Sequence, residues 1–412
     1  MRLALLLALS AAWPVQTLPS GDGSAIALGA DGGPRGIAVV LERRPAGRRT
    51  RILEERLGSR VRRIATSRNG FGPLELDHDR RGSRTHAWSA IPPGGGPRSV
   101  FVGEPGQGVR RLIATGANTL LTALDVAPSG AAVLAAWSRD GVFVTSRPPG
   151  GRFGPPVRIA GAGAGFPAAA IADDGTATVA YQPVNEGLEL ELRRIAPDGT
   201  VGAPARVASA LPAAGATAAT RPPALAVTAR GLAVAALTVT ERVAPGRERD
   251  PVRGSRVDTV GWAASADAPD PVRALSAANG AAGVPALRPV GDRVVIVWPQ
   301  ARTAEESPRT LRAVRWFARG PSAPETYRSP RSIDPGASLA LGGARAGAIA
   351  AYFTSSRRLY AVRLTRRGPF TGAERLSPDG QAVESVLATA DGARSVAVWT
   401  SGRRVHLARR RR

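Results

Sequence analysis

The chain has 412 residues, 43% of them hydrophobic, and a formal net charge of +24. It contains no cysteine and no lysine, so all 56 basic residues are arginine. These absences exclude disulfides, thiolate catalysis, cysteine-ligated metal sites and any site built on a Schiff-base or P-loop lysine.

The N-terminus has the pattern of a secretory signal peptide. Arg2 precedes the apolar run Leu3–Leu9, and the small residues that follow suit cleavage near Ala12. We therefore expect a signal peptide within residues 1–20, one domain over residues 21–412, and a secreted, extracellular protein. The alternative is an N-terminal strand or helix. No other stretch of about 20 residues stays apolar, so the sequence predicts no transmembrane segment.

A pattern of three strands recurs along the whole chain. An apolar strand and a tight polar turn precede a second apolar strand that ends at a large residue, and a third strand follows. The large residues are Leu41, Trp88, Trp137, Tyr181, Leu237, Trp298, Tyr352 and Trp399. Their spacing runs from 44 residues (Trp137 to Tyr181) to 61 residues (Leu237 to Trp298). We expect these side chains to fill the core between neighbouring sheets.

This period predicts the fold class. Four-stranded propeller blades need about 40–50 residues each, and a closing segment such as Phe153–Ala160 can supply each fourth strand. The sequence therefore predicts an all-β protein, a β-propeller of seven or eight four-stranded blades. We expect eight; seven is the alternative, because the repeat that ends at Trp88 is degenerate. A β-sandwich array and a β-helix explain the repeated four-strand unit less well.

The last repeat lacks a fourth strand. A closed propeller can complete such a sheet with an N-terminal strand, which also covers an exposed sheet edge. We expect the stretch around Ser24–Leu28 to do this.

Acidic and histidine residues offer few chemical sites. Asp-Gly pairs such as Asp31–Gly32 are strong hairpin signals, so we expect turns rather than calcium ligands or glycosidase carboxylates. Asp77-His78-Asp79, with His86 downstream, is the one grouping that could hold a metal, and we expect a surface turn there. The sequence predicts no catalytic residue, no metal ligand and no cofactor.

Arginines are scattered through every repeat, and several of the variable loops between second and third strands carry them. In a propeller these loops share one face with the connections between blades, and loops on a rigid scaffold commonly carry binding residues. We expect an anionic partner, such as an extracellular glycan or a cell-envelope polymer; the alternative is solvated loop tips. Aromatic residues make up only 5% of the chain, which does not favour a nucleic-acid site. The candidate binding residues are Arg43, Arg44, Arg48, Arg49, Arg242, Arg247, Arg249 and Arg302.

Together, the repeats resemble the secreted β-propeller proteins of high-GC bacteria that are loosely described as sialidase-like or BNR-like. The resemblance lies in segments such as Val133–Trp137 and Phe153–Ala160. The Asp-box turn of sialidases, Ser-x-Asp-x-Gly-x-Thr-Trp, is absent, and their catalytic Asp and Tyr–Glu pair have no counterpart here. We therefore expect an exported, monomeric, non-catalytic propeller that serves as a binding scaffold for an extracellular glycan, a cell-envelope polymer or a protein. The alternatives are a glycan-active hydrolase or lyase and a structural surface protein.

Overall fold

The computed structural model describes residues 15–18, 23–184, 189–208, 216–220, 222–243, 252–276, 280–303, 306–333, 339–344, 347–365, 370–378, 382–391 and 394–409. These residues form strands and connecting turns, and none of them lies in a helix. Accordingly, the described part of the chain holds no helix that could cross a membrane.

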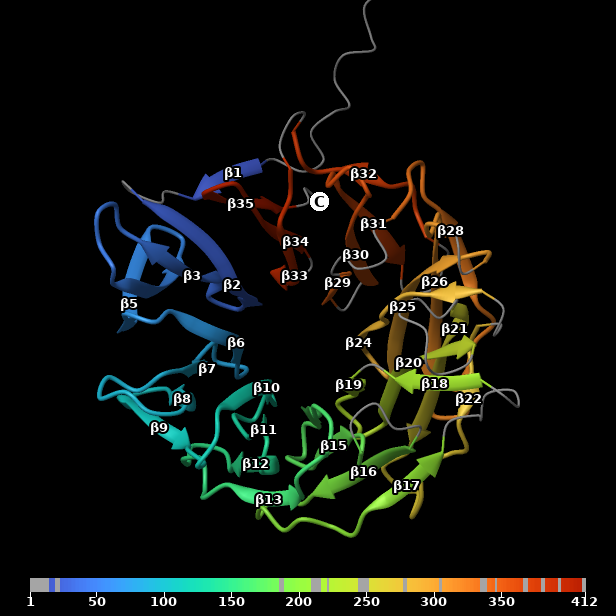
Figure 1. The fold of residues 1–412 in the computed structure, drawn as a ribbon, viewed down its shortest axis with the longest axis horizontal. Coiled ribbons are helices and arrows are strands. Elements are labelled where there is room, and N and C mark those ends of the chain that lie inside the picture. Colours follow the sequence, from blue (N-terminus) through green and yellow to red (C-terminus); the bar gives the residue numbers. More distant parts are fainter. Residues whose placement is uncertain are drawn as a thin grey trace, which may run out of the picture.

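Four antiparallel sheets of four strands follow one another from the N-terminal side of the ring (Figure 1). Each is a simple meander in chain order, as the repeat predicts. Their strands are β2 (Ser24–Gly33), β3 (Gly36–Arg44), β4 (Arg51–Leu57) and β5 (Arg60–Ser67); β6 (Phe71–His78), β7 (Arg84–Ala90), β8 (Ser99–Gly103) and β9 (Val109–Ile113); β10 (Thr119–Val126), β11 (Ala132–Ser138), β12 (Gly141–Arg147) and β13 (Val157–Ala160); and β14 (Ala168–Ile171), β15 (Ala177–Tyr181), β16 (Glu189–Ile195) and β17 (Ala205–Ala208).

The next two repeats share one sheet of eleven strands. One set of four consists of β19 (Ala224–Val227), β20 (Ala233–Val243), β21 (Val252–Trp262) and β22 (Arg273–Ala274). The other consists of β24 (Ala286–Val290), β25 (Arg293–Ala301), β26 (Thr310–Phe317) and β28 (Glu325–Arg328). The short strand β23 (Ala281–Ala282) joins them, because it pairs with both β21 and β25. Strands β18 (Ala216–Thr220) and β27 (Gly320–Pro321) complete the sheet.

The ring ends with two more four-stranded sheets. One contains β29 (Ala340–Ala344), β30 (Gly347–Phe353), β31 (Leu359–Thr365) and β32 (Glu374–Arg375). The other contains β33 (Ser385–Asp391), β34 (Arg394–Ser401), β35 (Arg404–Arg409) and the N-terminal β1 (Val15–Leu18).

An N-terminal strand therefore completes the last sheet, as the sequence predicts, but the expected segment was wrong. Strand β1 pairs with β35 from Val15 opposite Ala408 to Leu18 opposite Val405. The stretch expected to do this, Ser24–Leu28, instead begins β2, the inner strand of the first sheet. Cleavage near Ala12 would leave β1 in the mature chain. The signal peptide itself stays a prediction.

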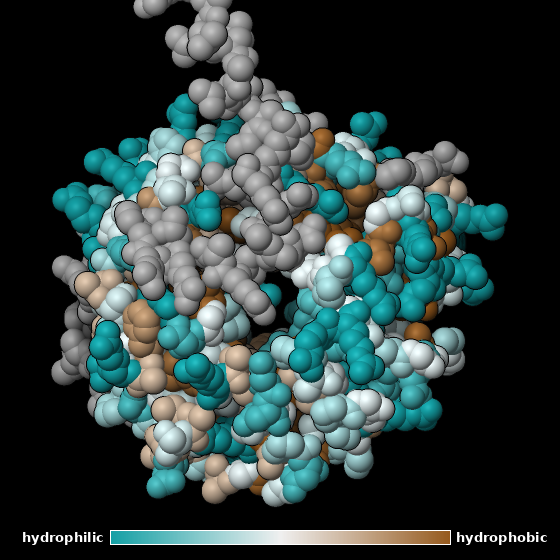
Figure 2. Space-filling view, turned by 180° about the vertical axis from the view of Figure 1, so that it is seen from behind, coloured by the Kyte–Doolittle hydropathy of each residue, from teal (hydrophilic) through white to brown (hydrophobic). Residues whose placement is uncertain are grey.

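The first strand of each repeat lies nearest the central opening. Strands β2, β6, β10, β14, β19, β24, β29 and β33 each contact the next in this order, and β33 contacts β2 (Figure 1). The ring is thus closed, and the fold is a β-propeller. Figure 2 shows mainly hydrophilic residues on one face of the ring and a small opening near its middle.

The core lies between neighbouring sheets. Each of the hydrophobic clusters among the described residues combines side chains from two neighbouring repeats, as in the cluster that contains Val133 from one repeat and Val179 from the next. The large residues predicted to end the second strands are buried, with Trp298 and Trp399 at 0% exposure, although several of these strands continue beyond them. Trp137 is the exception, being only partly buried. The prediction that these residues fill the space between sheets is otherwise confirmed.

Candidate functional site

Strand direction decides which loops share a face of the ring. Neighbouring strands of each repeat are antiparallel, so loops between second and third strands leave the same face as the connections between repeats. The described parts of the loops β3–β4 and β25–β26 are of this kind. The arginines predicted in these two loops therefore lie on one face.

The predicted arginines differ in their ion pairing and in their exposure to solvent. The Nε of Arg43 donates to Glu54 Oε1 at 3.1 Å, so its charge is neutralised. Exposed arginines of the same loop region are Arg44, Arg48 and Arg49. The side chain of Arg242 and the whole of Arg247 and Arg249 lie outside the described residues.

Among the candidate arginines that the structure describes, Arg302 lines a cavity. The cavity has a volume of about 860 Å³ and opens on the loop face, where β25 ends, β26 begins and β28 ends. Its lining includes Gln300 from β25, Thr310 from β26 and Arg328 from β28. Thr310 is opposite Gln300 on one side and Arg328 on the other in the strand register. These three positions therefore form one row across the sheet, and the hydroxyl of Thr310 donates to the main-chain oxygen of Gln300 at 2.7 Å.

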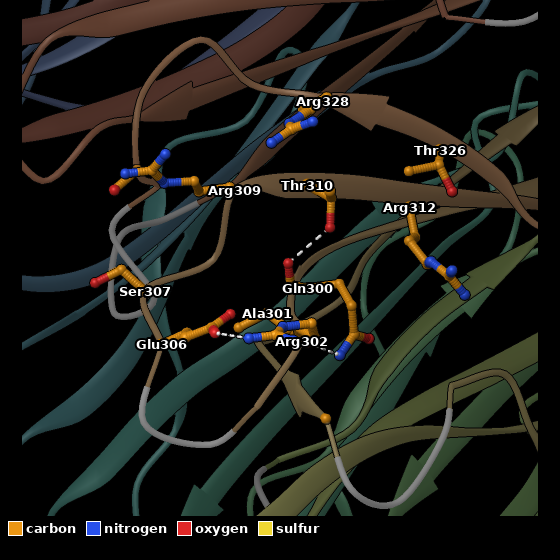
Figure 3. A pocket seen from close by; sticks show the side chains of 12 residues that line it. Gln300, Ala301, Arg302, Glu306, Ser307, Arg309, Thr310, Arg312, Thr326 and Arg328 are labelled. Atoms are coloured by element: carbon orange, nitrogen blue, oxygen red, sulfur yellow. Dashed lines mark hydrogen bonds and ion pairs between the residues drawn. The ribbon is translucent and has the colours of Figure 1, made fainter.

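Four arginines surround this space. Figure 3 shows Arg309, Arg328 and Arg312 along the upper part of the cavity and Arg302 along the lower part. Arg302 is 83% exposed and donates to Glu306 at 2.8 Å. That ion pair raises the pKa of the Arg302 guanidinium and lowers the pKa of the Glu306 carboxyl.

The other three arginines leave the cavity positively charged. Glu306 is the one carboxylate among the described lining residues, and Arg302 already binds it. No hydrogen-bonded or ion-paired acid accompanies Arg309, Arg312 or Arg328 in the part of the chain that the structure describes. Arginine is well suited to carboxylate, sulfate and phosphate groups because its planar guanidinium can donate two parallel hydrogen bonds. The cavity is therefore a candidate site for an anionic ligand.

Sequence reasoning identified Arg302 but missed these three. It looked for binding residues at loop tips, whereas Arg312 and Arg328 lie within strands. The available signal was the alternation Thr310-Leu311-Arg312, where Leu311 is fully buried and its two neighbours face the cavity.

A second polar cluster lies in a cavity of about 370 Å³, lined by the inner strands β6, β10, β14, β19 and β24. Asp77 and His78 end β6 and face this cavity together with Asp125 of β10 and Arg288 of β24. The predicted surface turn at Asp77–His78 was therefore wrong, because these residues continue the inner strand. The predicted turn at Asp31–Gly32 was wrong as well: both residues lie within β2, and Asp31 is 5% exposed.

Hydrogen bonds tie these carboxylates to the neighbouring strands. The Nδ1 of His78 lies 2.7 Å from Asp31 Oδ2. The main-chain N–H of Val126 donates to Asp77 Oδ2 at 2.7 Å, and that of Ile171 donates to Asp125 Oδ2 at 2.7 Å. Asp31, Asp77 and His78 are close enough to surround an ion, but both carboxylate oxygens of Asp77 accept main-chain N–H groups and His78 Nδ1 lies against Asp31, so we assign no metal ligand. His86 is not part of this group; it lies on β7, 3.4 Å from Glu55.

Desolvation among the packed inner strands is the main cause that raises the pKa of Asp77, followed by the charges of Asp125 and Asp31. The side chain of Glu75, on the same strand, is exposed, so it does not belong to this group. The pKa of Asp125 is raised by burial against the opposing N–H of Ile171. No aromatic residue is among the described residues that line this cavity.

Comparison with known proteins shows that the chain is similar to solved structures in its fold alone. No family model matches the chain, and no curated protein matches it. Solved β-propeller structures are similar to it, and none of those named here exceeds 14% identity. A catalytically inactive virginiamycin B lyase from Staphylococcus aureus with quinupristin is 10% identical, with a TM-score of 0.46 over 96% of this chain and 99% of that one. A lectin from Burkholderia pseudomallei is 14% identical, with a TM-score of 0.48 over 87% and 99%. The Dos1 propeller is 11% identical, with a TM-score of 0.41 over 82% and 92%.

Proposed function

We propose that this protein is an exported, eight-bladed, non-catalytic propeller that binds an anionic extracellular glycan at the arginine-lined cavity. One observation carries the proposal: Arg309, Arg312 and Arg328 flank a cavity of about 860 Å³ with no bonded acid among the described residues. Uncompensated cations at a concave surface attract anions and raise their local concentration.

The polar lining fits a glycan better than an apolar small molecule. Ser307, Thr310, Thr326 and Gln300 offer hydroxyl and amide groups between the arginines. Such groups can bind sugar hydroxyls while the guanidinium groups bind the acidic substituents. The proposal includes secretion, as expected from Arg2 and the apolar run that follows it.

Catalysis is the alternative, and only part of its signature is present. A glycan-active enzyme on this scaffold would need a cluster of carboxylates and an aromatic at the central channel. Asp77 and Asp125 supply the carboxylates, but main-chain N–H groups hold both of them. We therefore favour binding.

Binding to polygalacturonate, heparin and neutral dextran, measured by calorimetry at about 20 and 150 mM NaCl, tests this proposal. A triple Arg309→Ser, Arg312→Ser, Arg328→Ser variant is compared with a triple Arg44→Ser, Arg48→Ser, Arg49→Ser control, which removes the same charge from the exposed β3–β4 region. Because a charge-assisted hydrogen bond contributes about 1.5–3 kcal/mol, the cavity variant is expected to bind an anionic glycan at least about 10-fold more weakly than the control.

Each outcome has a clear meaning. A loss confined to the cavity variant supports the site. Equal losses in both triples would show a response to net charge rather than to the cavity. Absence of binding to every anionic glycan would favour the structural surface protein.

A further inference from the structure

Aspartate side chains join consecutive inner strands on one side of the central channel. Asp31 of β2 bonds to the ring of His78 on β6, Asp77 of β6 accepts the N–H of Val126 on β10, and Asp125 of β10 accepts the N–H of Ile171 on β14. Each bond therefore crosses from one sheet to the next. We call Asp77 and Asp125 the carboxyl pair.

The two members of the carboxyl pair are neighbours across the two inner strands. Asp77 accepts the N–H of Val126, the residue that follows Asp125, and both aspartates line the same cavity. Two carboxylates in contact repel each other, whereas one carboxyl and one carboxylate form a hydrogen bond. The carboxyl pair is therefore expected to keep one proton, as coupled acids do.

The charged groups around the pair are of both signs. Strands β14 and β19 present only Ala, Leu and Val to the cavity. The described charged or titratable groups around the pair are Asp31 on β2; Glu75, Asp77 and His78 on β6; Asp79 and Arg80 in the following turn; Arg84 on β7, whose Nε lies 3.8 Å from Asp31; Asp125 on β10; Arg147 on β12, whose charge acts on Asp77; and Arg288 on β24, whose charge lowers the pKa of Asp125.

We propose that Asp77 and Asp125 share a proton that holds β6, β10 and β14 together, so that loss of this proton loosens the ring as the pH rises. We call the protonated pair Asp77–Asp125 and its bonds to Val126 and Ile171 the clasp; it is a pH-sensitive contact between three consecutive sheets. The clasp is independent of the arginine-lined cavity, because it lies at the opposite ends of the strands.

The direction in which stability changes with pH follows from the number of protons bound by the folded and unfolded states. In the unfolded chain an aspartate loses its proton near pH 4, whereas the folded pair keeps one above that pH. Above about pH 4 the folded state therefore binds more protons than the unfolded state, so the cluster's contribution to stability falls as the pH rises.

Thermal unfolding of the full chain between pH 5 and pH 9 tests the clasp. Asp125→Asn keeps an oxygen for the N–H of Ile171 and offers a fixed N–H to Asp77, so it imitates the protonated pair. We expect the variant to melt a few degrees above wild type at pH 8.5, and the gap to narrow toward pH 5. Asp267→Asn, at an exposed turn, is the matched control and should shift nothing.

Glu75→Gln measures the separate contribution of Glu75, and Asp77→Asn repeats the test from the other side of the pair if the first variant fails to fold. Parallel melting curves for wild type and both aspartate variants across this pH range would overturn the proposal. A variant that is less stable than wild type at pH 8.5 would overturn it as well, because the fixed N–H should then help most.

Discussion

The ring of Trp137 stacks on the ring of Phe166, with centroids 4.5 Å apart, although Phe166 lies outside the sheet that contains Trp137. Trp137 is the last residue but one of β11, and Phe166 lies in the connection that leads from β13 to β14. The indole N–H of Trp137 also donates to the main-chain oxygen of Ala164 at 2.7 Å. The connection between sheets is thus held against the second strand of the preceding sheet.

Trp137→Ala is expected to lower the free energy of unfolding by about 3 kcal/mol, the lower end for loss of a large aromatic, because the ring is only partly buried. Trp137→Phe keeps the stack and loses the N–H bond, so it should cost about 1 kcal/mol. Urea unfolding measures both. An alanine variant as stable as wild type would mean that the ring serves a ligand at the surface and not the core.

Leu18 anchors the closing strand. It is 8% exposed and packs in a cluster with Ala25 and Val405, whereas Val15 at the other end of β1 is 43% exposed. Leu18→Ala should cost about 2–3 kcal/mol, and Val15→Ala should stay within about 0.5 kcal/mol. Chemical denaturation compares the two, with limited proteolysis reporting release of β1. Similar costs at both positions would contradict the register of β1 on β35.

His406 makes closure of the ring sensitive to acid. Its Nδ1 lies 3.1 Å from the hydroxyl of Thr17 on β1. Burial lowers the pKa of His406, and the charge of Arg404 adds to this. Below about pH 6.5 the unfolded state therefore binds more protons at this site, and its contribution to stability is lost as the pH falls.

His406→Asn removes that dependence and keeps a partner for Thr17. The melting temperature of the variant, relative to wild type, should rise as the pH is lowered from 7 to 5. This trend is opposite to that of the carboxyl pair, so the difference between variant and wild type isolates it. A constant difference across the range would show that His406 does not titrate between these pH values.

Gly141 begins β12 in a conformation that other residues rarely adopt. Its φ is +135°, and a Cβ there would lie 2.0 Å from the main-chain oxygen of Ala160 on β13. Gly141→Ala should cost at least about 2 kcal/mol, since both the backbone and the β12–β13 pairing must shift. Gly94→Ala, where a Cβ would meet nothing within 4 Å, is the control. Equal melting temperatures for the two variants would contradict this reading.

Much of the fold could be predicted because the repeat is local. Each second strand and its final large residue, Trp298 for example, is recognisable within a dozen residues, and strand order follows from chain order in a meander. The closing strand was mispredicted because β1 contains only four residues and pairs across nearly the whole chain. A short segment of this kind carries no distinctive periodicity.

Fewer of the residues that line the two cavities could be predicted from the sequence. Arg302 was recognised as a loop arginine, but only strand register shows that Arg312 and Arg328 lie beside it. Asp77 and Asp125 are 48 positions apart in the sequence, and each taken alone resembles an ordinary strand-end or turn residue. They meet because two inner strands are neighbours in the ring.

The sequence by itself determined the class of fold, the all-arginine positive charge and the chemistry that the chain lacks, because these depend on composition and on local periodicity. Only the tertiary structure decided which strand closes the ring, which arginines share a cavity and which aspartates line the same cavity. Those relationships depend on register and on contacts between sheets, which join residues that no local pattern connects.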